Sequence, residues 1–196
     1  MRTRGVEFSY LIPVAFIRPV EFALGSPDNV VLGIGMKFKA SPKQIFYTQF
    51  MLDDMDVAAA RKGKGFYRTK IAAQFGYKGY DLFKVKHLDF QTELNIVRPF
   101  VYAHKAPEQS YTNYNQSLTH PLGANFLESV TFINYWYKHW TASAKLQYAV
   151  QGKDGTYEHN GSNIFISDYL ITPNLGTAYG NTFLQGIKTR MINVEA

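Results

Sequence analysis

Apolar and polar residues alternate one by one through several segments of this chain, and this pattern restricts the fold more than any other feature. Every second residue of Val30–Lys39 is apolar, and Leu88–Ile96 repeats the pattern with Thr92 as the exception. Lys70–Gly79 and Thr141–Gln151 alternate in the same way. Because the side chains of a β-strand point to opposite faces in turn, such segments form strands with one apolar and one polar face. The pattern predicts an all-β protein.

The segments between the predicted strands differ in length in a regular way. Short connectors at Ala40–Lys43, Asp81–His87 and Lys138–Trp140 alternate with long ones at Asp53–Thr69, Ala103–Leu127 and Gly152–Gly180. In an antiparallel up-and-down sheet this order places every long connector at one end, as in outer-membrane barrels. The tight connector Gly25–Asn29 is the exception. The predicted strands are Phe8–Ala23, Val30–Lys39, Gln44–Leu52, Lys70–Tyr80, Leu88–Tyr102, Glu128–Tyr137, Thr141–Gln151 and Asn181–Ala196.

Composition leaves two kinds of β-protein open. No apolar run approaches the roughly 20 residues of a membrane helix, whereas a membrane β-strand needs only about 9–11 residues. Charged residues make up 18% of the chain, below the roughly 25% that is usual in soluble domains. Tyr135, Trp136, Tyr137 and Trp140 cluster at a short connector, where a membrane β-barrel carries an aromatic girdle. Alternation alone does not distinguish such a barrel from a soluble one.

The sequence contains no recognisable catalytic motif. It has no cysteine, its histidines lack the H-x-x-x-H spacing of zinc sites, and no serine lies in a G-x-S-x-G context. The acidic residues Asp53, Asp54 and Asp56 do not have the spacing of a calcium loop. We therefore expect no enzymatic activity, no metal site and no cofactor.

The net charge of +6 has its strongest local source in one basic stretch. Such a stretch is either a solvated loop or a surface that binds the phosphates of anionic lipids or glycans. Nucleic acid is not expected, because basic residues do not recur as a stripe on the other strands. The candidate anion-binding residues are Arg61, Lys62, Lys64, Arg68 and Lys70.

Four motifs occur in a fixed order along the chain. They are R-P-V-E-F followed by S-P-D-N at 18–29, Y-T-Q-F-M-L-D-D at 47–54, H-P-L-G-A-N-F-L-E at 120–128, and G-N-T-F-L-Q-G at 180–186. Together they resemble the motifs of the Bacteroidota outer-membrane β-barrels in the capsule-assembly Wzi-like and gliding-motility RemB group. With the strands between them, the resemblance covers most of the chain.

The resemblance implies a non-enzymatic barrel in the bacterial outer membrane, associated with surface polysaccharide, gliding motility or cell-surface export. Its implied partners are outer-membrane lipids, lipopolysaccharide, surface polysaccharide and other envelope, secretion or gliding proteins. Residues 1–196 would belong to one antiparallel, transmembrane barrel domain, as a C-terminal portion that lacks the closing strands. By motif position, a polar network inside the wall or at the loop rim would contain Arg18, Glu21, Asp53, Asp54, His120, Asn125, Glu128 and Gln185.

Two other functions remain open from the sequence. One is a porin or transporter of the same architecture. The other is a soluble β-barrel that binds a hydrophobic ligand or an acidic glycan, with its apolar face inside. The orientation of Leu94 relative to Glu93 distinguishes the membrane barrel from the soluble one, because the two residues lie on opposite faces of one predicted strand.

Overall fold

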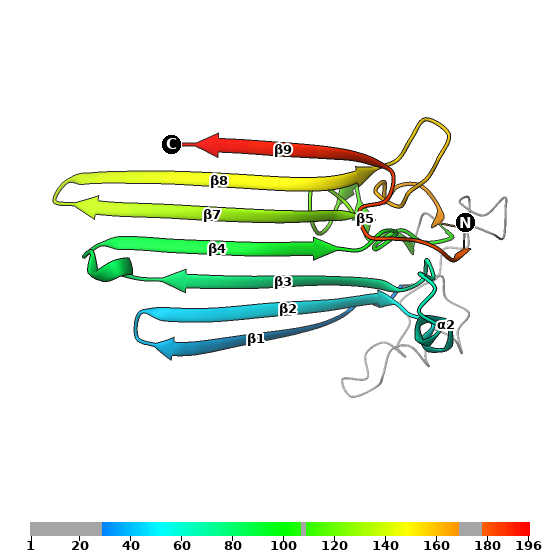
Figure 1. Cartoon of the computed structure of the whole chain (residues 1–196), viewed down its shortest axis with the longest axis horizontal. Coiled ribbons are helices and arrows are strands. Elements are labelled where there is room, and N and C mark those ends of the chain that lie inside the picture. The colour runs from blue at the N-terminus through cyan, green and yellow to red at the C-terminus, as the bar shows by residue number, and fades with distance from the viewer. Residues whose placement is uncertain (1–28, 107–108, 169–177) are drawn as a thin grey trace, which may run out of the picture.

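The computed structural model describes residues 29–106, 109–168 and 178–196, and this part of the chain consists mainly of β-strands. Seven long strands lie side by side in one sheet (Figure 1), and each pairs antiparallel with its neighbours. The all-β, up-and-down prediction is therefore confirmed. In sheet order the strands are β1 Leu32–Ser41, β2 Gln44–Asp54, β3 Lys70–Gly79, β4 Leu88–Val97, β7 Phe126–Tyr137, β8 Trp140–Lys153 and β9 Ile187–Glu195.

The remaining elements are short and lie in the connectors. Helix α2 (Val57–Arg61) follows β2, the 3-10 turn η2 (Leu82–Lys84) follows β3, and strands β5 (Thr112–Asn113) and β6 (Gln116–Ser117) form a small hairpin after β4. Among the described residues, no helix combines the length and apolar character needed to cross a bilayer.

Two predicted strands extend well beyond their observed limits, whereas the other strands of the described sheet differ from the prediction by no more than two residues at either end. Strand β4 ends at Val97 rather than Tyr102, because Pro99 lacks an N–H donor and both Phe100 and Tyr102 have positive φ angles of 65° and 73°. Strand β9 begins at Ile187 rather than Asn181, because the preceding residues bond to other connectors. The predicted strand Phe8–Ala23 lies outside the described residues.

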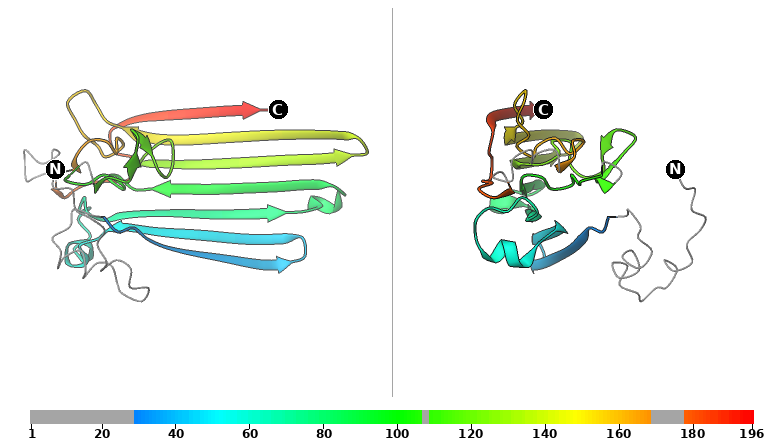
Figure 2. Two further views of the ribbon diagram at one scale, coloured as in Figure 1. Left: turned by 180° about the vertical axis from the view of Figure 1, so that it is seen from behind. Right: turned by 90° about the vertical axis from the view of Figure 1, so that its right-hand side faces the viewer.

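The connectors are sorted by length to the two ends of the sheet, as predicted. Short turns join β1 to β2, β3 to β4 and β7 to β8 at one end. The longer connectors after β2, β4 and β8 gather at the opposite end in Figure 1, and the reverse view in Figure 2 shows the same separation. The sheet therefore has a turn end and a loop end.

One face of the sheet is apolar and open across all seven strands. Met36 is 66% exposed at one edge and Ile192 is 70% exposed at the other, while Leu94 in the middle is 38% exposed. A row of paired residues connects them across the sheet: Met36, Thr48, Phe75, Leu94, Ser129, Tyr148 and Ile192. The next row toward the loop end is almost wholly apolar: Ile34, Phe50, Ala73, Ile96, Leu127, Val150 and Arg190.

The opposite face is polar in its middle and covered at its loop end. Val97 and Phe126 lie on this face and form a buried cluster with connector residues that include Val101, Ala124 and Ile164. The hydrophobic core thus lies between the loops and the polar face, not on the apolar face. Glu93 shares the polar face, whereas Leu94 belongs to the open apolar face. A mid-sheet row of this face contains Lys37, Tyr47, Gly76, Glu93, Val130, Gln147 and Asn193.

Candidate functional site

The polar face carries a hydrogen-bonded cluster around Glu93 that spans three strands. Gln91 of β4 donates to Glu93 Oε1 at 2.8 Å, and Gln74 of β3 donates to Oε2 at 3.2 Å. The hydroxyl of Tyr47 on β2 also donates to Oε1. All three donors are neutral, and hydrogen bonds to a carboxylate are stronger than those between neutral groups. The cluster therefore ties together the polar side chains of β2, β3 and β4.

A second cluster fixes a loop onto the same face through Glu128, which is only 1% exposed. Its carboxylate accepts hydrogen bonds from Gln147 at 2.7 Å and from Asn95 at 2.9 Å. His120 Nε2, from the connector before β7, lies 2.8 Å from Oε2. Because His120 Nδ1 accepts the backbone N–H of Leu122 at 3.2 Å, we assign the ring proton to Nε2, which donates to Glu128. Glu128 thus connects two neighbouring strands to the loop.

We expect the Glu128→Gln variant to be less stable than the wild type by about 2 kcal/mol. The NH₂ group of the new glutamine would replace a carboxylate oxygen, and it cannot accept the hydrogen bonds that this oxygen accepted. The free energy of unfolding in urea, measured on the purified protein, tests this value. Glu195→Gln is the control, since its side chain is 55% exposed and its surface ion pair contributes little. Equal destabilisation by the two substitutions would contradict the role of Glu128.

Asn125 joins two connectors to strand β8 at the loop end. Its amide nitrogen donates to the carbonyl oxygens of Gly152 at 2.7 Å and Gln185 at 2.9 Å, and its oxygen accepts the N–H of Leu184 at 2.9 Å. Asn125 has a φ of 57°, a left-handed conformation that asparagine tolerates better than most residues. A Cβ at Gly152 would collide with the Gln185 carbonyl oxygen, so the close approach of these segments requires glycine there.

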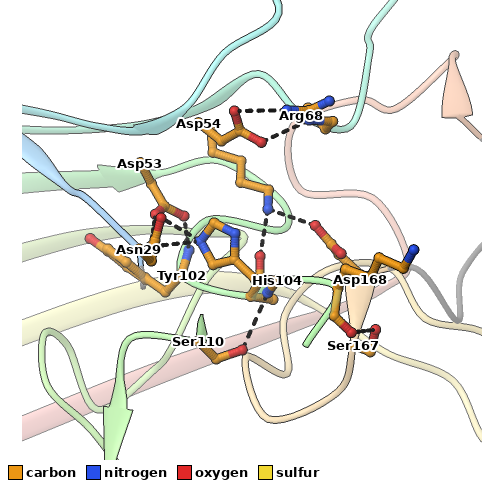
Figure 3. Close-up of polar contacts among 12 residues, drawn as sticks. Asn29, Asp53, Asp54, Arg68, Tyr102, His104, Ser110, Ser167 and Asp168 are labelled. Carbon is orange, nitrogen blue, oxygen red and sulfur yellow. Dashed lines mark hydrogen bonds and ion pairs between the residues drawn. The ribbon is translucent and has the colours of Figure 1, made fainter. Parts of the chain in front are cut away.

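A third cluster surrounds Asp53 at the loop end of β2 (Figure 3). Oδ2 of this buried carboxylate accepts the backbone N–H of Tyr102 at 2.8 Å. Its Oδ1 lies 2.9 Å from His104 Nε2 and 2.9 Å from Asn29 Nδ2. The backbone N–H of His104 in turn donates to Ser110 Oγ at 3.2 Å. Asp53 therefore anchors the connector between β4 and β7 to the end of β2.

A buried ion pair lies close to this cluster. Lys70, the first residue of β3, is fully buried, and its Nζ lies 2.6 Å from Asp168 Oδ2. Nζ also donates to the carbonyl oxygen of Ala103. The pair thus joins β3 to the connectors that follow β4 and β8. Because both charges are removed from water, each depends on the other for its stability.

The structure distributes the predicted polar residues over several contacts rather than one site. His120 bonds to Glu128, Asn125 bonds to the backbone of Gln185, and Asp53 and Asp54 make separate contacts. Gln185 also donates from Nε2 to the Asn160 carbonyl oxygen at 3.0 Å. The predicted residues Arg18 and Glu21 lie outside the described part of the chain.

The basic stretch is only partly available as a binding surface. Arg61, Lys62 and Lys64 are exposed, but Arg68 donates to both Asp54 oxygens, at 2.8 and 3.2 Å. The hydrogen bonds to Asp54 raise the pKa of the Arg68 guanidinium.

The position of Lys70 contradicts the expectation from the sequence that this residue binds anions. It does not contribute to an exposed anion-binding surface, because it lies on the same face of β3 as Ala72, beneath the loops, and pairs with Asp168. The partner Asp168 is 98 residues away in the sequence, and no local signal identifies it.

Asp154 organises the connector after β8, and sequence reasoning missed it. The N–H of Asn163 donates to its Oδ2 at 2.9 Å, the N–H of Asn160 donates to Oδ1, and His159 Nδ1 lies 3.1 Å from Oδ2. Burial alone would raise the pKa of Asp154, but the His159 ring and these backbone donors outweigh it and lower the pKa to about 2. The ionised carboxylate is therefore the form that holds this loop.

We expect this loop to loosen as the pH falls from about 4 to about 2. The stabilisation is fully present above the ordinary pKa of 3.8 and is lost as the pH falls toward the folded-state value, a change of about 2 kcal/mol. Hydrogen-exchange protection of the Asn160 and Asn163 amides measures it. Asp154→Asn is the control, because the protection of these two amides should not vary over this pH range in the variant. Constant protection of the amides in the wild type would contradict the role of the ionised Asp154 carboxylate.

The acidic residues of these clusters are engaged in internal contacts. Their carboxylates are occupied by neutral donors, by histidine or by a buried lysine, and no group of three or more histidine or acidic residues suited to a metal ion occurs in the described ranges. No protein-family model, curated protein or solved structure matches this chain.

Proposed function

We propose that this chain forms part of a non-enzymatic outer-membrane β-barrel, with its apolar face against lipid and its polar face toward a lumen occupied by its own loops. We assign it a scaffold role in an envelope complex associated with surface polysaccharide, gliding motility or cell-surface export, as the resemblance of its four motifs to the Wzi-like and RemB group suggests. The observation that carries the proposal is the open apolar face across seven strands, opposite a polar face that the connectors cover at its loop end.

The extent of the apolar face supports a lipid environment. Monomeric soluble proteins rarely expose a contiguous apolar patch larger than a few hundred Å², whereas this face continues through every strand of the described sheet. Strand β4 has 10 residues, which at about 3.3 Å per residue and a tilt of about 40° span about 25 Å of membrane. This is the height of the apolar band of an outer-membrane barrel.

Aromatic side chains lie at both ends of the strands, as expected at two membrane–water interfaces. At the turn end, Tyr137 is 54% exposed and Trp140 is 79% exposed. At the loop end, Phe66 and Tyr179 have ring centroids 5.1 Å apart. Aromatic residues at the two ends of the sheet fit the girdles of a membrane barrel.

The polar side supports a filled lumen and a scaffold role. Glu93 is satisfied by cross-strand donors, and Glu128 and Lys70 bond to groups from the connectors. A soluble β-barrel would instead bury the apolar face and leave these acids in water. Loops held by buried ionic contacts act as a plug, which favours a scaffold over an open porin.

Reconstitution of the full-length protein tests the membrane assignment. We expect it to insert into lipid vesicles, to resist extraction by alkaline carbonate and to keep its strands protected from added protease. A full-length protein that stays monomeric and soluble without detergent would refute the proposal.

Two further measurements test the role of the inserted protein. Planar-bilayer recordings should show no steady current, and a constant open conductance would favour the porin or transporter alternative. Cells that lack the protein should lose surface-attached polysaccharide or gliding; unchanged surface and motility would remove the scaffold role.

A further inference from the structure

Two connectors form a clamp at the loop end of the sheet, next to the apolar face. The N–H of Gly180 donates to the Lys64 carbonyl oxygen at 2.6 Å, and the N–H of Asn181 donates to that of Gly65 at 3.0 Å. A third bond runs from the N–H of Tyr67 to the Ala178 carbonyl oxygen at 3.0 Å. The basic connector after β2 is thus fixed to the connector before β9.

A cavity of about 530 Å³ lies within this clamp. Its chemistry is that of an anion site, because cationic side chains, hydroxyl groups and glycine-rich backbone surround it. The lining includes Lys64, Thr69, Arg98, Asn181 and Thr182, together with Gly63, Gly65 and Gly180.

Arg98 is one of the residues that line the cavity. Its guanidinium Nε is buried and has no hydrogen-bond partner among the described residues, although arginine donors are ordinarily satisfied when they are buried. The backbone N–H of Arg98 still donates to the Ile71 carbonyl oxygen at 3.2 Å, so the β4 ladder continues to this residue. By strand alternation, Arg98 therefore belongs to the same side of the sheet as Ile96 and Leu94.

The acidic residues near the clamp are already engaged elsewhere. Asp54 accepts both of its close hydrogen bonds from Arg68, and Asp56 accepts the backbone N–H of Ala59 at 2.9 Å as the cap of α2. Neither forms an ion pair with Arg98 or Lys64 in the described structure. Among the described residues, the cavity therefore has no acidic side chain as a counter-ion to its positive charge, which favours an external anion.

We propose that this cavity binds a phosphate group of an outer-leaflet glycolipid, with Arg98 and Lys64 as its cationic ligands. The inference rests on the proposed function, which places the apolar face in lipid and the clamp at the headgroup level beside it. Arginine presents planar donors that match phosphate oxygens, and lysine adds a compact charge. The fixed position of Arg98 at the strand end distinguishes this site from the exposed side chains of Arg61 and Lys62.

Titration of the full-length protein in nonionic detergent tests the site. The probes are bisphosphorylated lipid A, the same lipid without its phosphates, and inorganic phosphate. We expect Arg98→Gln and Lys64→Gln each to weaken binding of the phosphorylated lipid by about tenfold and to leave the phosphate-free lipid unaffected. Lys145→Gln, on the opposite face of the sheet, is the matched charge control and should bind as the wild type does.

The possible outcomes distinguish failure of the phosphate site from failure of the membrane assignment. The phosphate site is overturned if the wild type binds the two lipids with equal affinity. It is also overturned if both Lys64→Gln and Arg98→Gln fold and bind the phosphorylated lipid as tightly as the wild type does. Binding of inorganic phosphate alone overturns the lipid as its source. Vesicle insertion is measured on the same preparations. Insertion without phosphate preference removes only this site. Phosphate-dependent lipid binding by a protein that does not insert removes the membrane assignment and, with it, the outer leaflet as the source of the phosphate.

Discussion

On the proposed membrane assignment, the Leu94→Arg variant should insert poorly into vesicles and lose about 2–4 kcal/mol of stability, the usual effect of a cation at the lipid-facing midplane of a barrel. Leu94 lies in the middle of β4 and in the middle row of the open apolar face. A guanidinium placed there would lose water without gaining a partner, because its cross-strand neighbours are Phe75 and Ser129. The fraction of protein inserted, and urea unfolding of that fraction, provide the measurement.

Two control substitutions separate the effect of a charge on the apolar face from the effects of added charge alone and of altered side-chain shape. Gln49→Arg introduces the same charge on the polar face in the adjacent row, where we expect near-normal insertion. Leu94→Ile keeps the apolar character and should cost less than about 1.5 kcal/mol. If Leu94→Arg were as stable as Gln49→Arg, the apolar face would not contact lipid.

The Lys70→Met variant should lose about 3–5 kcal/mol, because it leaves the Asp168 carboxylate buried without its cation. Lys70 also donates to the Ala103 carbonyl oxygen, so the substitution releases two connectors from β3 at once. We expect protease to cleave the loop end sooner while the turn end stays protected. Unfolding in urea and limited proteolysis of the reconstituted protein measure the two effects.

A double variant distinguishes an unpaired charge from lost packing. Lys70→Met with Asp168→Leu removes both charges and should recover most of the lost stability, since an apolar pair of similar volume often replaces a buried ion pair without loss. The surface pair of Lys145 and Glu195 is the control, and Lys145→Met should have little effect. A double variant no more stable than Lys70→Met would show that the pair itself is not the cause.

The amino-acid sequence by itself determined the strands, their faces and the sorting of the connectors. These features depend on local periodicity, because neighbouring side chains of a strand alternate between faces whatever the strand pairs with. Strand β3 illustrates this result, since its predicted span of Lys70–Tyr80 differs from the observed Lys70–Gly79 by one residue. The error at β4 also has a local cause, because the residues after Pro99 are apolar and suit a strand by composition, while positive φ angles turn the backbone away.

Only the tertiary structure decided which polar residues meet. The bond between Tyr47 and Glu93 depends on the register of three strands, and a shift by one residue would reverse every face. Lys70 and Asp168 meet because two long connectors fold over the same end of the sheet. The unpartnered Nε of Arg98 likewise lies at a cavity between connectors that are distant in sequence. Contacts of this kind arise from chain packing over long separations, and alternation within a strand carries no information about them.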